Sequence, residues 1–227
     1  MTRLFIFLIL SCALGCTETS DSPSEAPPAH VVSGETMGTT YTIRLTNLTG
    51  GETLESIQVA VDKELATVNQ QMSTYIDDSE LSRFNTSASE DWFSVSHEVV
   101  EVVKLALSIS EKTNGKYDVT VGPLVNLWNF GPNPMLQEIP TDEEINSALS
   151  RVGYEHLSIR EDPPALKKSK PDLYVDLSSI AKGHGVDRIA SVLDVMDIHG
   201  YMIEIGGEVR TKGSKADGKF WRLGVEN

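Results

Sequence analysis

The feature that most constrains the fold is a strand-like apolar run that passes directly into a helical pattern. Residues 173–177 have strand composition, and helical spacing follows over residues 179–195, at Ile180, Val186, Ile189, Val192 and Leu193. This junction predicts a strand that feeds a helix. Because a helix N-terminus offers free backbone N–H groups and the positive end of a dipole, the junction suits a phosphate. Lys182 would add a full positive charge.

Small side chains crowd this junction, at Ser178, Ser179, Ala181, Gly183 and Gly185. A backbone-lined anion or nucleotide pocket requires such residues. Two carboxylates flank them: Asp176 and Asp187 can fix a ribose hydroxyl or a ring N–H, or can form a strand-end turn and a helix salt bridge. Lys182 could bind a phosphate, or it could be a surface lysine at the start of the helix. His184 has no histidine partner at metal-ligand spacing, so we expect it to face solvent.

The N-terminus predicts an exported lipoprotein. Arg3 precedes an apolar run over residues 4–14 that is too short to span a bilayer and resembles a secretory signal. Both cysteines, Cys12 and Cys16, end this run, so neither can form a disulfide within the folded domain. Residues 13–16 resemble a bacterial lipoprotein box with Cys16 as the lipidated residue. Cys12 is a second match, and an ordinary signal peptide is the remaining alternative.

Composition divides the chain into a signal peptide over residues 1–16, a disordered tether over residues 17–30, and one domain over residues 31–227. The tether is rich in Ser, Thr, Glu and Pro and has little to bury. The domain is long enough to form its own core. A net charge of -14 argues against nucleic acid or an anionic membrane surface as partner. A phosphate ligand would therefore need local positive groups.

Apolar periodicity and caps predict an α+β fold with mixed strands and helices in one domain. Alternation over residues 31–48 predicts a strand pair, and helices are expected at 53–72, 81–84, 96–112 and 141–152, the three longer ones capped by Thr53, Ser96 and Thr141. Further strands are expected at 117–121, 157–160, 201–205 continuing through 208–211, and 221–225. The basic segment 163–171 could form a hairpin with the strand at 173.

The aromatic residues leave one alternative open. Trp92, Trp128 and Trp221 are most simply core residues. Tyr75 could pack in the core or stack on a flat ring. The sequence lacks a Ser-His-Asp order, a P-loop motif and a C-x-x-C pair, so it does not support the common hydrolase, P-loop or zinc interpretations. The residues alone indicate an exported domain that binds a phosphorylated ligand, without indicating a reaction.

Five stretches together resemble one family. They are residues 35–41, residues 72–75 with 79–85, residues 117–128, residues 176–187 and residues 205–208. In this order they resemble the ApbE family of FAD:protein FMN transferases, and the resemblance covers nearly all of residues 33–225. It implies an ApbE-like, T-fold-like domain.

The resemblance also implies an activity. Such an enzyme splits FAD at its pyrophosphate, passes FMN to a Thr or Ser hydroxyl of a target protein and releases AMP, with Mg²⁺ required. The targets would be flavoproteins of membrane redox complexes, reached from the periplasmic side of a bacterial cell membrane. By motif position, FAD contacts are expected at Met37, Tyr75, Lys116, Tyr117, Asp118, Asp176 and Lys182, and the backbone oxygen of Ser179 is expected to bind the metal.

Two departures from the family pattern qualify these expectations. Relatives carry further residues after the strand at 221–222, including a histidine-bearing stretch and an aspartate and threonine of the magnesium site, whereas this sequence ends at Asn227. We therefore expect a C-terminally truncated chain, with little or no transferase activity by itself. Ser178 and Ser179 also replace glycines that are common in relatives. A flavin carrier without catalysis and an FAD pyrophosphatase are the alternative functions.

Overall fold

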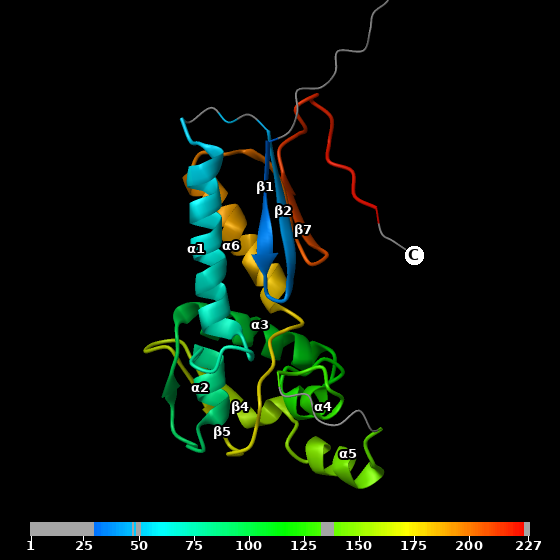
Figure 1. Ribbon diagram of the computed structural model, residues 1–227. Helices are drawn as coiled ribbons and strands as arrows, with labels where there is room; N and C mark the ends of the chain where they lie inside the picture. The colour runs from blue at the N-terminus through cyan, green and yellow to red at the C-terminus, as the bar shows by residue number, and fades with distance from the viewer. Residues whose placement is uncertain (1–29, 47, 49–50, 133–138, 225–227) are drawn as a thin grey trace, which may run out of the picture.

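The computed structural model describes residues 30–46, 48, 51–132 and 139–224. The predicted signal peptide, Cys16 and the predicted tether up to residue 29 lie outside these ranges. Figure 1 shows an elongated molecule with two lobes, one built on a sheet covered by helices and the other mainly helical. The mixture of helices and strands confirms the predicted α+β class. None of the helices in the part of the chain that the structure describes has the length and apolar composition of a membrane span.

The first lobe is an antiparallel sheet covered on one face by helices. Its strands are β1 (His30–Thr36), β2 (Thr39–Thr46), β6 (Gly200–Ile205) and β7 (Glu208–Lys212), in the order β1-β2-β6-β7. The helices α1 (Leu54–Met72) and α6 (Ala181–Val195) pack against it (Figure 1). Alternate side chains Tyr41, Ile43 and Leu45 are buried toward these helices. The predicted strand pair is confirmed, with β1 beginning at His30.

The second lobe holds the remaining elements around a separate core. Its helices are α2 (Glu80–Thr86), α3 (His97–Lys112), α4 (Gly122–Leu127), α5 (Asp142–Leu149) and the 3-10 helix η1 (Tyr154–His156). A small sheet of β3 (Phe93–Ser94), β4 (Leu157–Arg160) and β5 (Ala165–Lys168) has the order β3-β5-β4. Met37, in the turn between β1 and β2, packs against the cores of both lobes.

The helix starts follow the predicted caps. The hydroxyls of Thr53, Ser96 and Thr141 accept hydrogen bonds from backbone N–H groups one turn on, at 3.1, 3.4 and 3.3 Å. These bonds satisfy donors that a helix N-terminus leaves free. The predicted turn at 81–84 is a full helix, α2, whereas α5 ends at Leu149, before the predicted residue 152.

The predicted strand at residues 173–177 is wrong: the segment forms no strand, although Leu173, Val175 and Leu177 are buried. The side chain of Asn85 takes the place of a neighbouring strand: Val175 N donates to its Oδ1 and its Nδ2 donates to Val175 O, both at 2.8 Å. Asp176 N donates to Val119 O at 2.7 Å. The predicted hairpin also has a different partner, because the basic segment pairs as β5 with β4. Lys168 at its end is buried, and its Nζ donates to Leu173 O at 3.3 Å.

Three other strand predictions need correction. Residues 117–121 form a loop, and Gly122 and Pro123 begin α4, since proline is well placed in a first helical turn. Residues 208–211 do not continue β6 but return beside it as β7. Gly206 and Gly207 have φ angles of 52° and 96°, a left-handed conformation that glycine adopts readily and that a tight hairpin turn requires. Residues 221–224 form no strand.

The tryptophans do not occupy the core as predicted. Trp92 and Trp128 are 40% and 44% exposed, and Trp221 is half-buried. Arg160 lies over the ring of Trp92, 5.0 Å from its centroid, so this aromatic serves a surface cation–π contact.

Candidate functional site

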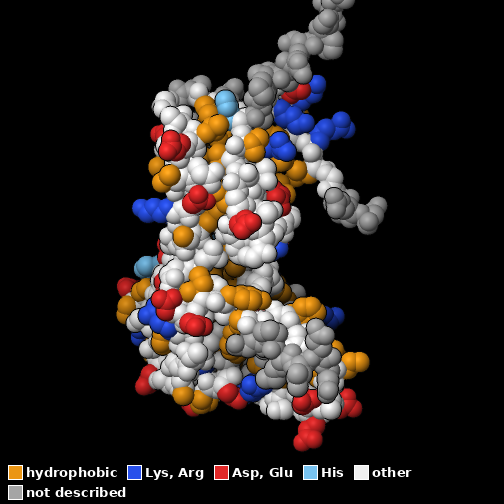
Figure 2. All heavy atoms as spheres, in the orientation of Figure 1, with side chains coloured by type: hydrophobic (Ala, Val, Ile, Leu, Met, Phe, Trp, Pro, Cys, Tyr) orange, Lys and Arg blue, Asp and Glu red, His pale blue; other side chains and the backbone are white. Residues whose placement is uncertain are grey.

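A cavity of about 670 Å³ opens where the β1–β2 turn, the end of α1 and the start of α6 meet. Three predicted ligand contacts line it: Met37, Tyr75 and Lys182. Ser178 and Phe130 line it as well. Figure 2 shows apolar side chains at the waist of the molecule, between the two lobes. The fold therefore gathers side chains from segments far apart in the sequence around one hollow large enough for a nucleotide.

Tyr75 is not a core residue. Its side chain is 63% exposed, and its Oη donates to Phe130 O at 2.9 Å. Phe130 is 76% exposed and lines the same cavity. An exposed aromatic ring adds little to the hydrophobic core. Two such rings beside one cavity are therefore available to stack on a flat ligand. The core alternative for Tyr75 is therefore wrong, and stacking on a flat ring stays a prediction.

Lys182 and the start of α6 place positive groups beside one side of the cavity. Lys182 lies in the first turn of α6, and its Nζ donates to Gly206 O at 2.9 Å. The N-cap residue, Ile180, makes no side-chain cap. An ammonium group and a helix N-terminus together attract a phosphate. Glu208 Oε1 lies 3.4 Å from the lysine Nζ and offsets part of its charge.

Met37 is held in an unusual backbone conformation at the cavity. Its φ angle of 50° is left-handed, which is uncommon for a residue other than glycine. Gly185 on α6 faces it, and a Cβ at this position would lie 3.0 Å from Met37 Cε. The small size of Gly185 therefore serves the packing of Met37, rather than forming part of a backbone-lined anion pocket.

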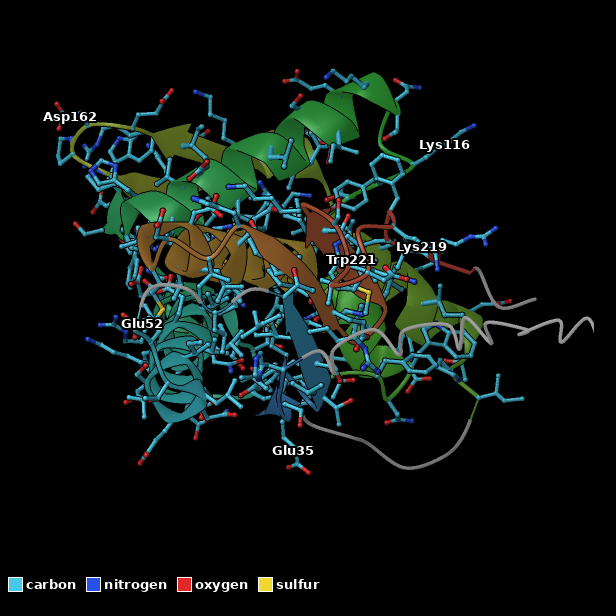
Figure 3. All side chains as sticks on the ribbon, turned by 90° about the horizontal axis from the view of Figure 1, so that it is seen from above. Glu35, Glu52, Lys116, Asp162, Lys219 and Trp221 are labelled. Carbon is cyan, nitrogen blue, oxygen red and sulfur yellow. The ribbon has the colours of Figure 1, made fainter. Side chains whose placement is uncertain are left out.

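The predicted contacts at residues 116–118 do not line this cavity. The hydroxyls of Tyr117 and Ser179 lie 3.0 Å apart, which ties this loop to the start of α6. The carboxylate of Asp118 accepts hydrogen bonds from Thr120 N at 2.7 Å and Tyr154 N at 2.9 Å, so it holds the loop. Lys116 points away from the body of the molecule (Figure 3). The FAD contacts of these three residues stay predictions.

Both carboxylates of the junction are engaged within the protein. Asp176 is 8% exposed, and its Oδ1 accepts a hydrogen bond from Ser178 N at 2.8 Å. Asp187 Oδ1 forms an ion pair with Arg210 Nη1 at 2.6 Å. These contacts are a turn at Asp176, after a segment that is not a strand, and a salt bridge between α6 and β7 at Asp187, and neither of them excludes ribose binding. The predicted FAD contact of Asp176 is not tested by them.

His184 does not face solvent as predicted. Its Nε2 is buried and has no hydrogen-bond partner among the described residues. Burial lowers the pKa of the imidazole, and the nearby Arg188 lowers this pKa further. His184 lines a second hollow of about 520 Å³ between α3, α6 and β7. Helical spacing cannot reveal this position, because α3 and β7 cover the residue from elsewhere in the chain.

Two further residues of the site region escaped the sequence prediction. Asn85 positions the segment before α6 through both of its side-chain hydrogen bonds, and Phe130 adds a second aromatic ring to the cavity. Asn85 is the last residue of the family-like stretch 79–85, but nothing in the local sequence indicates that this asparagine is buried. Phe130 gave a weak signal, as an aromatic residue before Gly131 and Pro132.

The described residues do not make a magnesium site by themselves. Within the described ranges, no three His, Cys, Asp or Glu side chains gather as metal ligands. The backbone oxygen of Ser179 is a suitable hard donor, but magnesium requires six oxygen ligands in octahedral geometry. Mg²⁺ binding at Ser179 therefore stays a prediction.

Comparison with known sequences gives one consistent relationship. The model described as "ApbE family" matches residues 37–227. A protein named FAD:protein FMN transferase from Vibrio cholerae is 49% identical over 203 residues, which cover 89% of this chain and 60% of the relative. A protein of the same name from Salmonella typhimurium is 36% identical over 215 residues, covering 94% of this chain and 61% of the relative. The chain thus spans about 60% of the length of these relatives.

Comparison with solved structures shows the same fold. The flavin transferase ApbE from Vibrio cholerae superposes with a TM-score of 0.84 at 49% identity, over 88% of this chain and 64% of that one. The apo form of the flavinyl transferase ApbE from Pseudomonas stutzeri superposes with a TM-score of 0.81 at 34% identity, over 87% of this chain and 65% of that one.

Proposed function

Because this chain belongs to the ApbE family, we propose that the protein transfers FMN from FAD to a Thr or Ser hydroxyl of a target protein and releases AMP. The observation that carries the proposal is the cavity that gathers Met37, Tyr75 and Lys182. The names of the relatives support FAD as the donor. The requirement for Mg²⁺ rests on the family resemblance.

The chemistry is a phosphoryl transfer in which the protein mainly positions the reactants. The P–O bond between the FMN phosphorus and the bridging oxygen breaks, and this oxygen leaves with AMP. The acceptor hydroxyl forms a new ester bond to the same phosphorus, and its proton passes to the phosphate of the departing AMP or to water. The Lys182 ammonium and the N-terminus of α6 lie on the side of the cavity where they would stabilise negative charge on phosphoryl oxygens.

The cavity also supplies a surface for the flavin ring. Tyr75 and Phe130 present exposed aromatic side chains to it, and the Oη of Tyr75 holds the Phe130 backbone. Aromatic stacking would orient the isoalloxazine ring and so place the pyrophosphate relative to α6.

The location of the activity is part of the same proposal. A lipid on Cys16 would anchor the protein to a bacterial cell membrane on the periplasmic side, with flavoproteins of membrane redox complexes as targets. The N-terminal signal pattern and the lipoprotein box support this location.

The test separates three activities. The full-length protein is incubated with FAD, Mg²⁺ and an acceptor domain that carries a Thr, and AMP and in-gel flavin fluorescence of the acceptor are followed. AMP with a fluorescent acceptor supports the transferase, and AMP alone supports an FAD pyrophosphatase. FAD binding with neither product supports a flavin carrier and contradicts the proposal.

A pair of matched variants links the activity to the cavity. Lys182→Met should lower the rate of AMP release, because it removes the ammonium of a residue that lines the cavity. Lys63→Met, on the exposed side of α1, should leave that rate unchanged. Equal rates for the two variants would place the reaction elsewhere.

A further inference from the structure

Positive charge is concentrated in one short stretch of this acidic chain. Residues 210–222 contain five basic side chains and one acidic side chain, a net charge of +4, whereas the whole chain has a net charge of -14. The basic residues are Arg210, Lys212, Lys215, Lys219 and Arg222. The net charge of the whole chain argues against an anionic membrane surface as a partner, but this argument does not apply to residues 210–222, which are positively charged.

This stretch lies at the end of the sheet where the described chain begins. His30 pairs with Leu45, so β1 starts beside the end of β2. At that same end, Thr46 Oγ1 donates to Ser214 O at 3.0 Å and fastens the turn that follows β7. Figure 1 shows the start of β1 and this turn at the same end of the molecule, and Figure 2 shows Lys and Arg side chains gathered there.

The charges differ in how far nearby carboxylates neutralise them. Lys212 pairs with Asp194 at 2.9 Å, and Lys219 pairs with Asp217 at 3.0 Å. Both pairs are solvent-accessible, where ion pairs are weak and exchange readily. Lys215 and Arg222 form no ion pair within the described part of the chain. Lys219 also points away from the body of the molecule in Figure 3.

We propose that this surface, made of Lys212, Lys215, Lys219 and Arg222 and here named the basic end, docks on anionic phospholipid headgroups of the membrane that anchors the chain. The inference rests on the lipid anchor of the proposed function. The 13 residues from 17 to 29 reach at most about 45 Å. A tether this short keeps the basic end close to the bilayer, so a weak attraction suffices to orient the protein.

Docking by the basic end would fix the height of the catalytic cavity. The chain runs along β1 from His30 at the basic end to Thr36, directly before Met37 at the cavity. Seven strand residues at roughly 3.3 Å each separate the two ends by about 20 Å. The cavity, at the waist of the molecule, would then lie that far above the bilayer, within reach of hydroxyl groups on domains that project from membrane proteins.

The test uses protein without residues 1–16, which removes none of the described elements and leaves no lipid. Its binding to vesicles of phosphatidylcholine is compared with binding to vesicles that contain phosphatidylglycerol, by flotation at low and high salt. We expect binding only to the anionic vesicles, and its loss at high salt. The triple variant Lys215→Ser, Lys219→Ser, Arg222→Ser should bind on the order of 100-fold more weakly, since each charge contributes about five-fold.

A matched variant removes three exposed lysines elsewhere, Lys63→Ser, Lys104→Ser and Lys112→Ser, and should bind like the unchanged protein. The inference is overturned if the unchanged protein does not prefer anionic vesicles, or if both triple variants lose binding equally. FAD affinity, measured on the same samples, should be equal for all three proteins. Because vesicle binding requires neither FAD nor lipid on Cys16, its outcome is independent of whether the transferase proposal holds.

Discussion

At the scale of single residues, the ring of Tyr75 is the sharpest test of the cavity as a flavin site. Tyr75→Ala removes a 63% exposed ring that lines the cavity. If the ring stacks on the flavin, its loss should cost about 1–3 kcal/mol of binding free energy, or roughly 5- to 150-fold in Kd. Quenching of flavin fluorescence during titration with FAD measures this change.

Tyr75→Phe is the matched control, because it keeps the ring and removes only the Oη bond to Phe130 O. Its Kd should stay within a few-fold of the unchanged protein. FAD affinity that is the same in all three proteins would contradict a stacking role.

His184 predicts a loss of stability in acid. Burial, with Arg188 as the second cause, holds the folded-state pKa of His184 below 6.5, while Glu101 and Asp187 act in the opposite direction. As pH falls below 6.5, the unfolded chain therefore binds more protons at this residue than the folded chain, and the free energy of unfolding decreases. Urea unfolding at pH 7.5 and pH 5 should show this decrease. It should be smaller in His184→Gln, which does not titrate.

The control is His97→Gln, at the exposed start of α3. This variant should keep the pH dependence of the unchanged protein. If His184→Gln keeps it as well, His184 is not the group responsible.

At the scale of elements, the segment 173–177 depends on one asparagine. Asn85→Ala removes two hydrogen bonds and leaves the buried N–H and C=O of Val175 without partners. At about 1–3 kcal/mol for each unsatisfied group, the free energy of unfolding should fall by roughly 2–6 kcal/mol. Urea denaturation measures it, with Asn146→Ala on the exposed face of α5 as the control. A loss below 1 kcal/mol would mean that the segment does not need this clamp.

Local signals predicted the elements that local contacts form. The predicted caps and the predicted strand pair at the start of the domain are confirmed. Each cap at Thr53, Ser96 and Thr141 depends on a hydroxyl within one helical turn, and the strand pair depends on one short turn. The segment 173–177 looked like a strand for a sound reason, since its alternate side chains are buried. Its backbone partner is a side chain 90 positions away, which no local pattern contains.

The same distinction applies to the site. The junction before α6, Met37 and Tyr75 were indicated by small residues and by family motifs, and the fold places all three at one cavity. The sequence predicted Trp128 in the core and His184 facing solvent, and both predictions are wrong. The exposure of each side chain depends on which elements cover it, which residue type and spacing do not show. The turn at Gly206 reverses the chain where alternation predicted a continuous strand.

At the scale of the whole molecule, the cavity joins two separately packed cores. Met37 packs against both, and the cavity lining draws Val68 and Met72 from one core and Lys182 from the helix that covers the other lobe's sheet. A ligand seated there contacts both lobes, so its binding energy should resist their separation. At 100 times its Kd, FAD would add about 2.7 kcal/mol to the free energy of unfolding.

Hydrogen exchange can locate this coupling. With FAD bound, backbone amides should exchange more slowly in the β1–β2 turn and at residues 73–76 and 178–182, which adjoin elements of the first lobe, and at Phe130, which follows α4 of the second lobe, because all of these line the cavity. The β4–β5 hairpin lies away from the cavity lining and should exchange as before. Slower exchange confined to α3 and β7 would instead place FAD in the hollow beside His184, and the two-lobe site would be wrong. Protection at Phe130 together with the β1–β2 turn requires one ligand that bridges the lobes, since the two belong to different lobes.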